Sequence, residues 1–228
     1  MFRLIHTNSI VEVYACSDPR RCTADRPLVV VALGNTCDFA CGVTDWYESP
    51  AWGADFVICV RSRNFNQAEY VRGSSDGESC SDWTESNSKH TQLVMDGVVE
   101  CLKGEAPCHC KWIICGLSGG CVTAVTVAAA LCTTPDKVIG IVADSGVPGS
   151  GEALQLRQVP VSVYRYTRPA EQMGKPEYWR NGDVTVEWTR RGYNVVEDEA
   201  YTCYGHASFL TNSVLRNWVW WHHGPKQA

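Results

Sequence analysis

Apolar, β-branched runs recur along the chain, and each has a length typical of a β-strand. The runs cover residues 10–15, 27–33, 55–60, 111–115, 137–143 and 159–166, with a weaker one at 193–196. Three of them contain the sequences VVVAL, FVICV and VIGIVA, which are apolar at consecutive positions and not at alternate ones. Consecutive apolar positions are expected in parallel strands that are covered on both faces. The pattern therefore predicts the central strands of a parallel sheet.

Segments with apolar residues at helical spacing lie between these runs, at residues 88–103, 119–131, 184–191 and 207–221. Because strand and helix alternate from Pro27 onward, the expected fold class is α/β, with a mostly parallel central sheet, right-handed crossovers and helices on both faces. The strand before Pro27 is expected to form part of an edge hairpin. A length of 228 residues, 45% of them hydrophobic, fits a single domain spanning residues 1–228.

Charge and hydropathy argue against two classes of partner. The formal net charge of −5 comes from 25 acidic and 20 basic residues scattered along the chain, so no basic cluster is available to neutralise the phosphates of a nucleic acid. No stretch approaches the roughly 18 consecutive apolar residues that a membrane-spanning helix needs. The first apolar run is too short for a signal peptide. The chain is therefore expected to be soluble.

The positions of the cysteines indicate the cellular compartment in which the chain is expected to reside. Two of the 13 cysteines, Cys59 and Cys115, lie inside apolar runs, where a thiol packs as a small hydrophobic group. This favours a reducing compartment, so the expected location is the cytoplasm. A secreted mature form remains the alternative, because other cysteines are spaced like pairs in loops, and sequence alone does not give their connectivity.

The most specific motif is GLSGG at residues 116–120. It directly follows the apolar run KWIIC and directly precedes the helical segment GCVTAVTVAAALC. A serine on a tight strand-to-helix turn needs small neighbours, since helix and strand approach closely there, and the turn exposes its Oγ. This context predicts Ser118 as a nucleophile, with the Gly119 N–H facing a developing oxyanion and Leu117 beside the substrate site. The alternative is a glycine-rich turn without chemistry.

A serine hydroxyl needs a general base, which is expected downstream of it near the carboxyl ends of the strands. His206 in the sequence YGHASF meets this expectation, because it follows the last predicted strand and precedes an apolar helical segment. The other histidines lie upstream of Ser118 or at the end of the chain. His206 is therefore the predicted base, and the alternative is a structural histidine.

The GLSGG motif, the GH of CYGHASF and the order of strands and helices resemble the α/β-hydrolase superfamily over residues 27–221. The short connection between residues 143 and 159 is similar to that of lidless members: dienelactone hydrolases, carboxylesterases, acyl-protein thioesterases, and feruloyl-esterase or polyhydroxybutyrate-depolymerase-like enzymes. The DSGVP stretch resembles the SG-x-x-P stretch of several of these. The resemblance implies a serine hydrolase that needs no cofactor.

In that superfamily an acid, which orients the histidine, usually follows the strand corresponding to residues 159–166. The family pattern HG-x-x-D is replaced here by YTRPAE, which makes Glu171 the nearest carboxylate and the first candidate. Asp144, after the preceding strand, is the alternative, and Asp183 comes third. Glu177 is expected to be a solvated surface charge. A site with only serine and histidine, or an inactive site, stays open.

A second oxyanion donor is expected in the loop after the first central strand, where the family often has HG or HGG. This chain has LGN at residues 33–35. Gly34 allows a close backbone approach, and the N–H of Asn35 is the candidate donor. The alternative is a simple Gly-Asn turn.

No metal site is expected. Cys108, His109 and Cys110 carry ligand-type side chains, but neighbouring positions in an extended loop point apart and no second pair lies at zinc-site spacing. Acidic residues between positions 76 and 82 lack the glycine and the closing glutamate of a calcium loop.

The sequence thus predicts a serine hydrolase that cleaves a carboxylic ester or thioester, on a small or polymer-attached substrate, through an acyl-serine intermediate. An acyltransferase would use the same residues. The alternatives from other classes are a non-catalytic ligand-binding or interaction protein of this fold, and a lyase or isomerase. The sequence does not identify the substrate or the oligomeric state.

Overall fold

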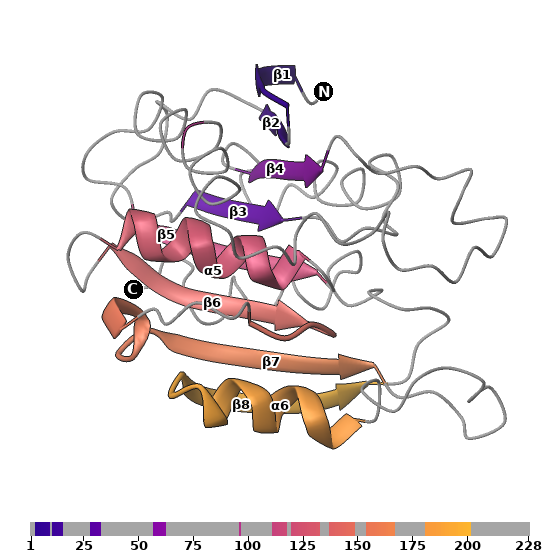
Figure 1. Cartoon of the computed structure of the whole chain (residues 1–228), viewed down its shortest axis with the longest axis vertical. Helices are drawn as coiled ribbons and strands as arrows, with labels where there is room; N and C mark the ends of the chain where they lie inside the picture. Colours follow the sequence, from indigo (N-terminus) through magenta and orange to yellow (C-terminus); the bar gives the residue numbers. More distant parts are fainter. Residues whose placement is uncertain are drawn as a thin grey trace, which may run out of the picture.

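A computed structural model describes residues 3–9, 11–15, 28–32, 57–62, 96, 111–117, 120–132, 137–148, 154–166 and 181–201. These residues contain one eight-stranded sheet with the strand order β1-β2-β4-β3-β5-β6-β7-β8 (Figure 1). The strands are β1 Arg3–Thr7, β2 Val11–Ala15, β3 Leu28–Ala32, β4 Val57–Ser62, β5 Trp112–Leu117, β6 Val138–Asp144, β7 Pro160–Tyr166 and β8 Asn194–Tyr201. The helices are α5 Gly120–Leu131, α6 Asn181–Arg190 and the short 3-10 helix η5 Leu154–Leu156.

The predicted α/β class and the mostly parallel sheet are confirmed. Strand β2 pairs antiparallel with both β1 and β4, and every other pair of neighbouring strands is parallel. The expected edge hairpin is formed by β1 and β2, although the sequence pattern indicated only the second of these two strands. Strand β8 continues to Tyr201, beyond the predicted end at Val196.

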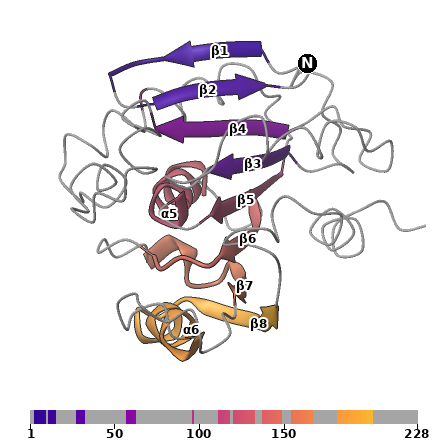
Figure 2. The same cartoon turned by 90° about the vertical axis from the view of Figure 1, so that its right-hand side faces the viewer.

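The predicted helices 119–131 and 184–191 correspond to α5 and α6, and α6 begins three residues earlier than expected. The predicted helix 88–103 lies outside the described residues except for Asp96, and the predicted helix 207–221 lies outside them entirely. Both described α-helices cover the same face of the sheet (Figure 2). In the part of the chain that the structure describes, no helix is long and apolar enough to cross a membrane.

Side chains of successive strand residues point to opposite faces, and the neighbouring strands β5 and β6 are buried on both. Trp112 and Ile114 of β5 belong to the core under α5 and α6, while their neighbours Ile113 and Cys115 are also fully buried. Val142 of β6 is buried as well. For β6, whose run is VIGIVA, this burial confirms the interpretation of a consecutive apolar run as a covered parallel strand. For β3 and β4 the same interpretation stays a prediction, because their side chains lie outside what the structure describes.

Candidate functional site

The predicted serine turn lies between β5 and α5. Strand β5 ends at Leu117 and helix α5 begins at Gly120, so Ser118 and Gly119 alone separate the two elements along the chain. The strand before the motif and the helix after it are therefore as predicted. Ser118 and Gly119 themselves lie outside the described residues.

Gly116 shows why this turn requires small residues. A Cβ atom added at Gly116 would lie 2.5 Å from Cys121 Cα, and 2.9 Å from both Cys121 N and Ala124 Cβ. The first of these contacts is to helix backbone, which a change of side-chain rotamer cannot move away. The first turn of α5 thus packs directly on the end of β5, as the sequence analysis expected for a serine on such a turn.

The connection from β5 to α5 lies at the point in the sheet where the direction of strand addition reverses. The chain moves from β3 to β4 on one side, then crosses back past β3 to β5 and continues through β6, β7 and β8 on the other side. In open α/β sheets, ligands bind outside the carboxyl ends of the strands at such a point. Ala32, at the end of β3, pairs with Gly116 in β5. The segments that follow β3 and β5 therefore leave the sheet from adjacent positions at its carboxyl edge.

Asp144 lies at the same edge, one strand further along. It is the last residue of β6 and pairs with Leu117, the residue before Ser118. Its side chain is fully buried, and Ser145 Oγ donates a hydrogen bond to its Oδ1 at 2.7 Å. The Ser145 N–H donates to the Tyr164 carbonyl at 2.8 Å. Ser145 has a φ of 54°, which lies in the left-handed region that non-glycine residues rarely occupy.

The structure thus brings together two of the predicted site residues, Leu117 and Asp144, at neighbouring positions on β5 and β6. Asp183, the candidate acid ranked third from the sequence, belongs to the first turn of α6. The remaining predicted site residues lie outside the described part of the chain: Gly34, Asn35, Ser118, Gly119, Glu171 and His206. Glu177 lies outside it as well. Cys108, His109 and Cys110 also lie outside it.

Cys121, at the start of α5, is an inert neighbour of this site. Its thiol is fully buried and donates a long hydrogen bond to the Asp144 carbonyl, with a sulfur–oxygen distance of 3.8 Å. Burial, assisted by the charge of Asp144, raises the pKa of the Cys121 thiol well above its usual range. Since the thiolate is the reactive form of cysteine, Cys121 packs here as a small apolar residue.

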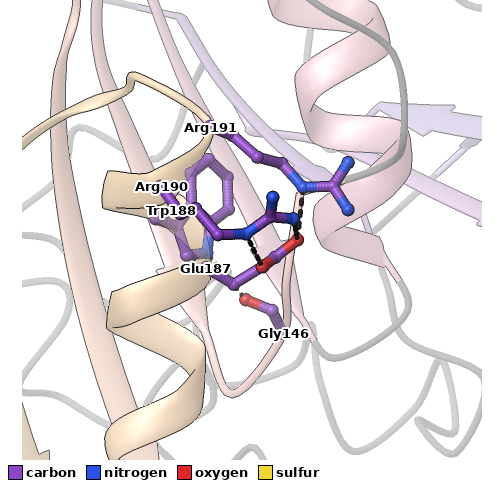
Figure 3. Close-up of polar contacts among 5 residues, drawn as sticks. All are labelled: Gly146, Glu187, Trp188, Arg190 and Arg191. Atoms are coloured by element: carbon purple, nitrogen blue, oxygen red, sulfur yellow. Dashed lines mark hydrogen bonds and ion pairs between the residues drawn. The ribbon is translucent and has the colours of Figure 1, made fainter.

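Trp188 of α6 anchors the chain that follows Asp144. Its Nε1 donates a hydrogen bond of 2.9 Å to the Gly146 carbonyl, and both residues are drawn in Figure 3. Its ring contacts the edge of Tyr193 at a centroid distance of 4.9 Å. No sequence motif pointed to a role for Ser145 or Trp188. An indole at an apolar helix position indicates burial, but its partner 42 residues away is visible only in the fold.

Glu187, one residue before Trp188, closes the end of α6. It accepts hydrogen bonds from Arg190 and Arg191 (Figure 3). These two guanidinium groups, with Arg190 contributing most, lower the pKa of the Glu187 carboxyl to about 2. Cations in the last turn also interact favourably with the helix dipole. The cluster fixes the end of the helix that carries Trp188.

The Trp188→Phe variant is expected to destabilise the protein by about 1–3 kcal/mol, because a buried Gly146 carbonyl loses its donor while most of the apolar contact is kept. Urea unfolding of wild type and variant gives the difference in free energy. Val186→Ala, at an exposed position of the same helix, is the control and is expected to change the free energy by less than about 0.5 kcal/mol. A loss below 0.5 kcal/mol in Trp188→Phe would contradict the assigned anchor.

No model of a known protein family matches the sequence, and no curated protein matches it. Solved structures do match it. The poly(3-hydroxybutyrate) depolymerase LpqC from Bordetella parapertussis superposes with a TM-score of 0.57 at 14% identity, covering 100% of this chain and 92% of its own. Carboxylesterase CesB (YbfK) from Bacillus subtilis has a TM-score of 0.53 at 13% identity, covering 97% of this chain and 92% of its own. The chain has the α/β-hydrolase fold.

A thermostable esterase also has this α/β-hydrolase fold, with a TM-score of 0.55 at 14% identity over 96% of this chain. The chain spans 62% of that esterase's length. At such identities the similarity extends to the fold and not to the chemistry. The resemblance drawn from GLSGG, GH and the order of elements is thus confirmed at the level of the fold.

Proposed function

We propose that this protein is a serine hydrolase that cleaves a carboxylic ester or thioester through an acyl-serine intermediate. The observation that carries the proposal is the two-residue connection from the end of β5 to the start of α5, with Gly116 packed against the Cys121 backbone. Ser118 belongs to that turn in the sequence. A serine on a sharp strand-to-helix turn is the arrangement that exposes a nucleophilic Oγ in this fold.

In the proposed reaction, Ser118 Oγ attacks the carbonyl carbon while His206 takes the hydroxyl proton. The N–H groups of Gly119 and Asn35 donate to the oxyanion that develops. When the tetrahedral intermediate collapses, the bond to the leaving alcohol or thiol breaks, and His206 returns the proton to it. His206 then deprotonates a water that attacks the acyl-serine, which releases the acid and restores the serine.

The ends of β3 and β5 lie side by side, which supports the proposal that Asn35 and Gly119 donate to the same oxyanion. The chain from Ala32 runs on to Gly34 and Asn35, and the chain from Gly116 runs on to Ser118 and Gly119. Two backbone donors from these two segments could approach one oxyanion from both sides. Two residues are proposed as the acid that orients His206. Glu171 is proposed because of its place in the sequence pattern, and Asp144 because it is buried at the position that pairs with Leu117.

The substrate is proposed as a small or polymer-attached ester. The matched structures include a poly(3-hydroxybutyrate) depolymerase, whose name denotes a polymeric ester, and a carboxylesterase. The short connection from β6 to β7, residues 145–159, supports an open site without an inserted lid. We propose no cofactor or metal in the reaction, since the serine, the histidine and backbone donors suffice for acyl transfer.

A fluorophosphonate probe tests the proposal, because it forms a stable adduct only with an activated serine. We expect one adduct by intact mass on the wild type and none on Ser118→Ala. Ser162→Ala, which removes a buried serine of β7, is the matched control and should keep the adduct. Turnover of p-nitrophenyl acetate and butyrate is measured beside it. Folded wild type without an adduct would overturn the hydrolase and favour a non-catalytic binding protein.

A further inference from the structure

The described charges of this protein divide between the two edges of the sheet. Strands β5 to β8 are parallel, so their amino ends form one edge and their carboxyl ends, where the proposed site lies, form the other. A cation precedes each of these strands at the amino edge: Lys111 before β5, Lys137 before β6, Arg157 before β7, and Arg190 and Arg191 before β8. Among the described residues, the acid at this edge is Glu187, which binds Arg190 and Arg191.

Backbone contacts place these cations in one row. The Trp112 N–H donates to the Lys137 carbonyl at 2.7 Å, so the chain entering β5 touches the chain entering β6. Arg157 Nε lies 3.7 Å from the position that a Cβ atom would take on Gly192, the residue after Arg191. The amino edge of β5 to β8 is therefore positive in the part of the chain that the structure describes.

The carboxyl half of the sheet has the opposite sign. Its acidic residues are Asp144 at the end of β6, Asp183 in the first turn of α6, and Glu197, Asp198 and Glu199 in β8. The described cations of this half are Arg61 of β4 and Arg165 of β7, and Arg165 pairs with Asp198. Acidic residues thus exceed cations at the edge where the proposed site lies.

One register row connects these acids to the proposed nucleophile. Leu117 pairs with Asp144, Asp144 with Tyr164, and Tyr164 with Glu199, which is exposed. Neighbouring strands lie about 4.8 Å apart, so Glu199 is about 14 Å from Leu117 along this row. Ser118 follows Leu117 directly. Glu199 is therefore close enough to act on a charge in the site through space, and too far to touch the reacting atoms.

The sequence of the segment that follows β3 has the same sign. This segment, residues 33–56, begins with the proposed oxyanion donor Asn35 and its neighbours, and it contains no lysine or arginine. Its acidic residues are Asp38, Asp45, Glu48 and Asp55. Composition thus adds negative charge to a segment that starts at the carboxyl edge.

Compensation of helix dipoles does not account for this separation of charge. Helices favour acids in the first turn and cations in the last turn, but α5 has neither an acid in its first turn nor a base in its last. Lys111 and Lys137 precede strands, and Glu197 and Glu199 lie within one. The charges therefore create a field across the sheet that the helix ends do not require.

We propose that the site around Ser118 prefers esters without negative charge and discriminates against esters whose acyl or alcohol part carries a carboxylate. This inference rests on the proposed function and names its substrate class. Acids near a site lower the local concentration of an anionic substrate. The cations do not offset this effect, because β6 has seven residues, which separate the edges by about 20 Å, beyond a Debye length of about 10 Å.

The test compares three p-nitrophenyl esters of similar length: the neutral butyrate, the anionic succinate half-ester and the cationic 4-(trimethylammonio)butyrate. Each kcat/KM is divided by the rate of hydrolysis by hydroxide, which removes differences in intrinsic reactivity. At about 0.01 M salt we expect a value about fivefold lower for the anionic ester than for the neutral one, and no deficit for the cationic ester. At about 1 M salt the deficit should disappear, because the Debye length falls to about 3 Å.

Variants at the two edges separate the local field from the net charge of the protein. Glu199→Gln should raise kcat/KM of the anionic ester about twofold at low salt, and Glu199→Lys about threefold, with the neutral ester unchanged. Arg157→Gln removes one charge from an exposed residue at the opposite edge and is the matched control. It should leave the ratio of anionic to neutral ester unchanged. Circular dichroism verifies the fold of each variant, and Glu199→Gln decides if Glu199→Lys does not fold.

The outcomes separate this inference from the function on which it rests. If the neutral and anionic esters are cleaved equally well at low salt, the charge preference is overturned and the proposed function stands. A deficit that persists at about 1 M salt also overturns it, because direct contact and not a screened field then excludes the carboxylate. A wild type that forms no fluorophosphonate adduct and cleaves none of the esters overturns the proposed function, and the charge preference with it.

Discussion

Gly116→Ala is expected to destabilise the protein by about 3 kcal/mol or more, at the upper end of what overpacking a core costs. The new methyl group would lie 2.5 Å from Cys121 Cα and 2.9 Å from Ala124 Cβ, so β5 and α5 would have to move apart. Both elements belong to the buried centre of the fold, where neighbouring side chains leave little space for such a movement. Urea unfolding followed by circular dichroism gives the loss in free energy.

Gly192→Ala is the matched control for the effect of adding a methyl group to a glycine. Gly192 has a φ of 80°, and the nearest atom to an added Cβ, Arg157 Nε, is 3.7 Å away. The substitution introduces backbone strain of about 1–2 kcal/mol but no collision. A larger loss in Gly116→Ala than in Gly192→Ala would therefore measure the close approach of helix and strand. Equal losses would contradict the tight turn on which the proposed function rests.

The sequence pattern predicted the parts of the fold whose signals are local. The consecutive apolar runs located the central strands, and the motif GLSGG with its flanking segments located the turn between β5 and α5. Both follow from rules that act within about ten residues: burial on two faces selects continuous apolar runs, and a close turn selects glycine. Gly116 is the clearest instance, since its neighbours in space are also its neighbours in sequence.

Strand β8 shows where a local pattern fails. Its second half contains Glu197, Asp198 and Glu199, which hydropathy alone assigns to a loop. In the fold these residues pair with β7, where Tyr164 donates to Glu197 and Arg165 forms an ion pair with Asp198 at 2.5 Å. Among the strands that the structure describes, β8 lies at the end of the sheet order, next to β7. An edge strand tolerates charged residues, and such residues also discourage pairing with other chains.

The candidate site likewise combines features that the sequence predicted with features that are visible only in the fold. Asp144 was recognised as a candidate acid from its place after a predicted strand, but its full burial and its bond from Ser145 required the fold. No sequence rule predicts a left-handed serine, because its conformation depends on the Tyr164 carbonyl, which binds its N–H from the next strand. The anchor from Trp188 to Gly146 is likewise a long-range contact. Long-range polar contacts at a strand end thus define this part of the site.

Ser118→Ala and His206→Ala are each expected to lower kcat for p-nitrophenyl acetate by about 10⁶-fold, and the double variant is expected to lose no more than either alone. The reason is that the two groups act in one step: without the base the hydroxyl keeps its proton, and without the hydroxyl the base has no proton to accept. Once either group is removed, the oxyanion donors and binding alone support the residual rate.

Burst and steady-state kinetics of the single and double variants measure these losses, with Ser162→Ala as the control that keeps the wild-type rate. If the double variant lost the product of the two single losses, Ser118 and His206 would act in separate steps, and the acyl-serine mechanism would be wrong. If His206→Ala kept its rate while Ser118→Ala lost it, the serine would remain the nucleophile and its base would lie elsewhere. The shared loss is therefore the kinetic signature that the turn between β5 and α5 and the histidine after β8 form one catalytic unit.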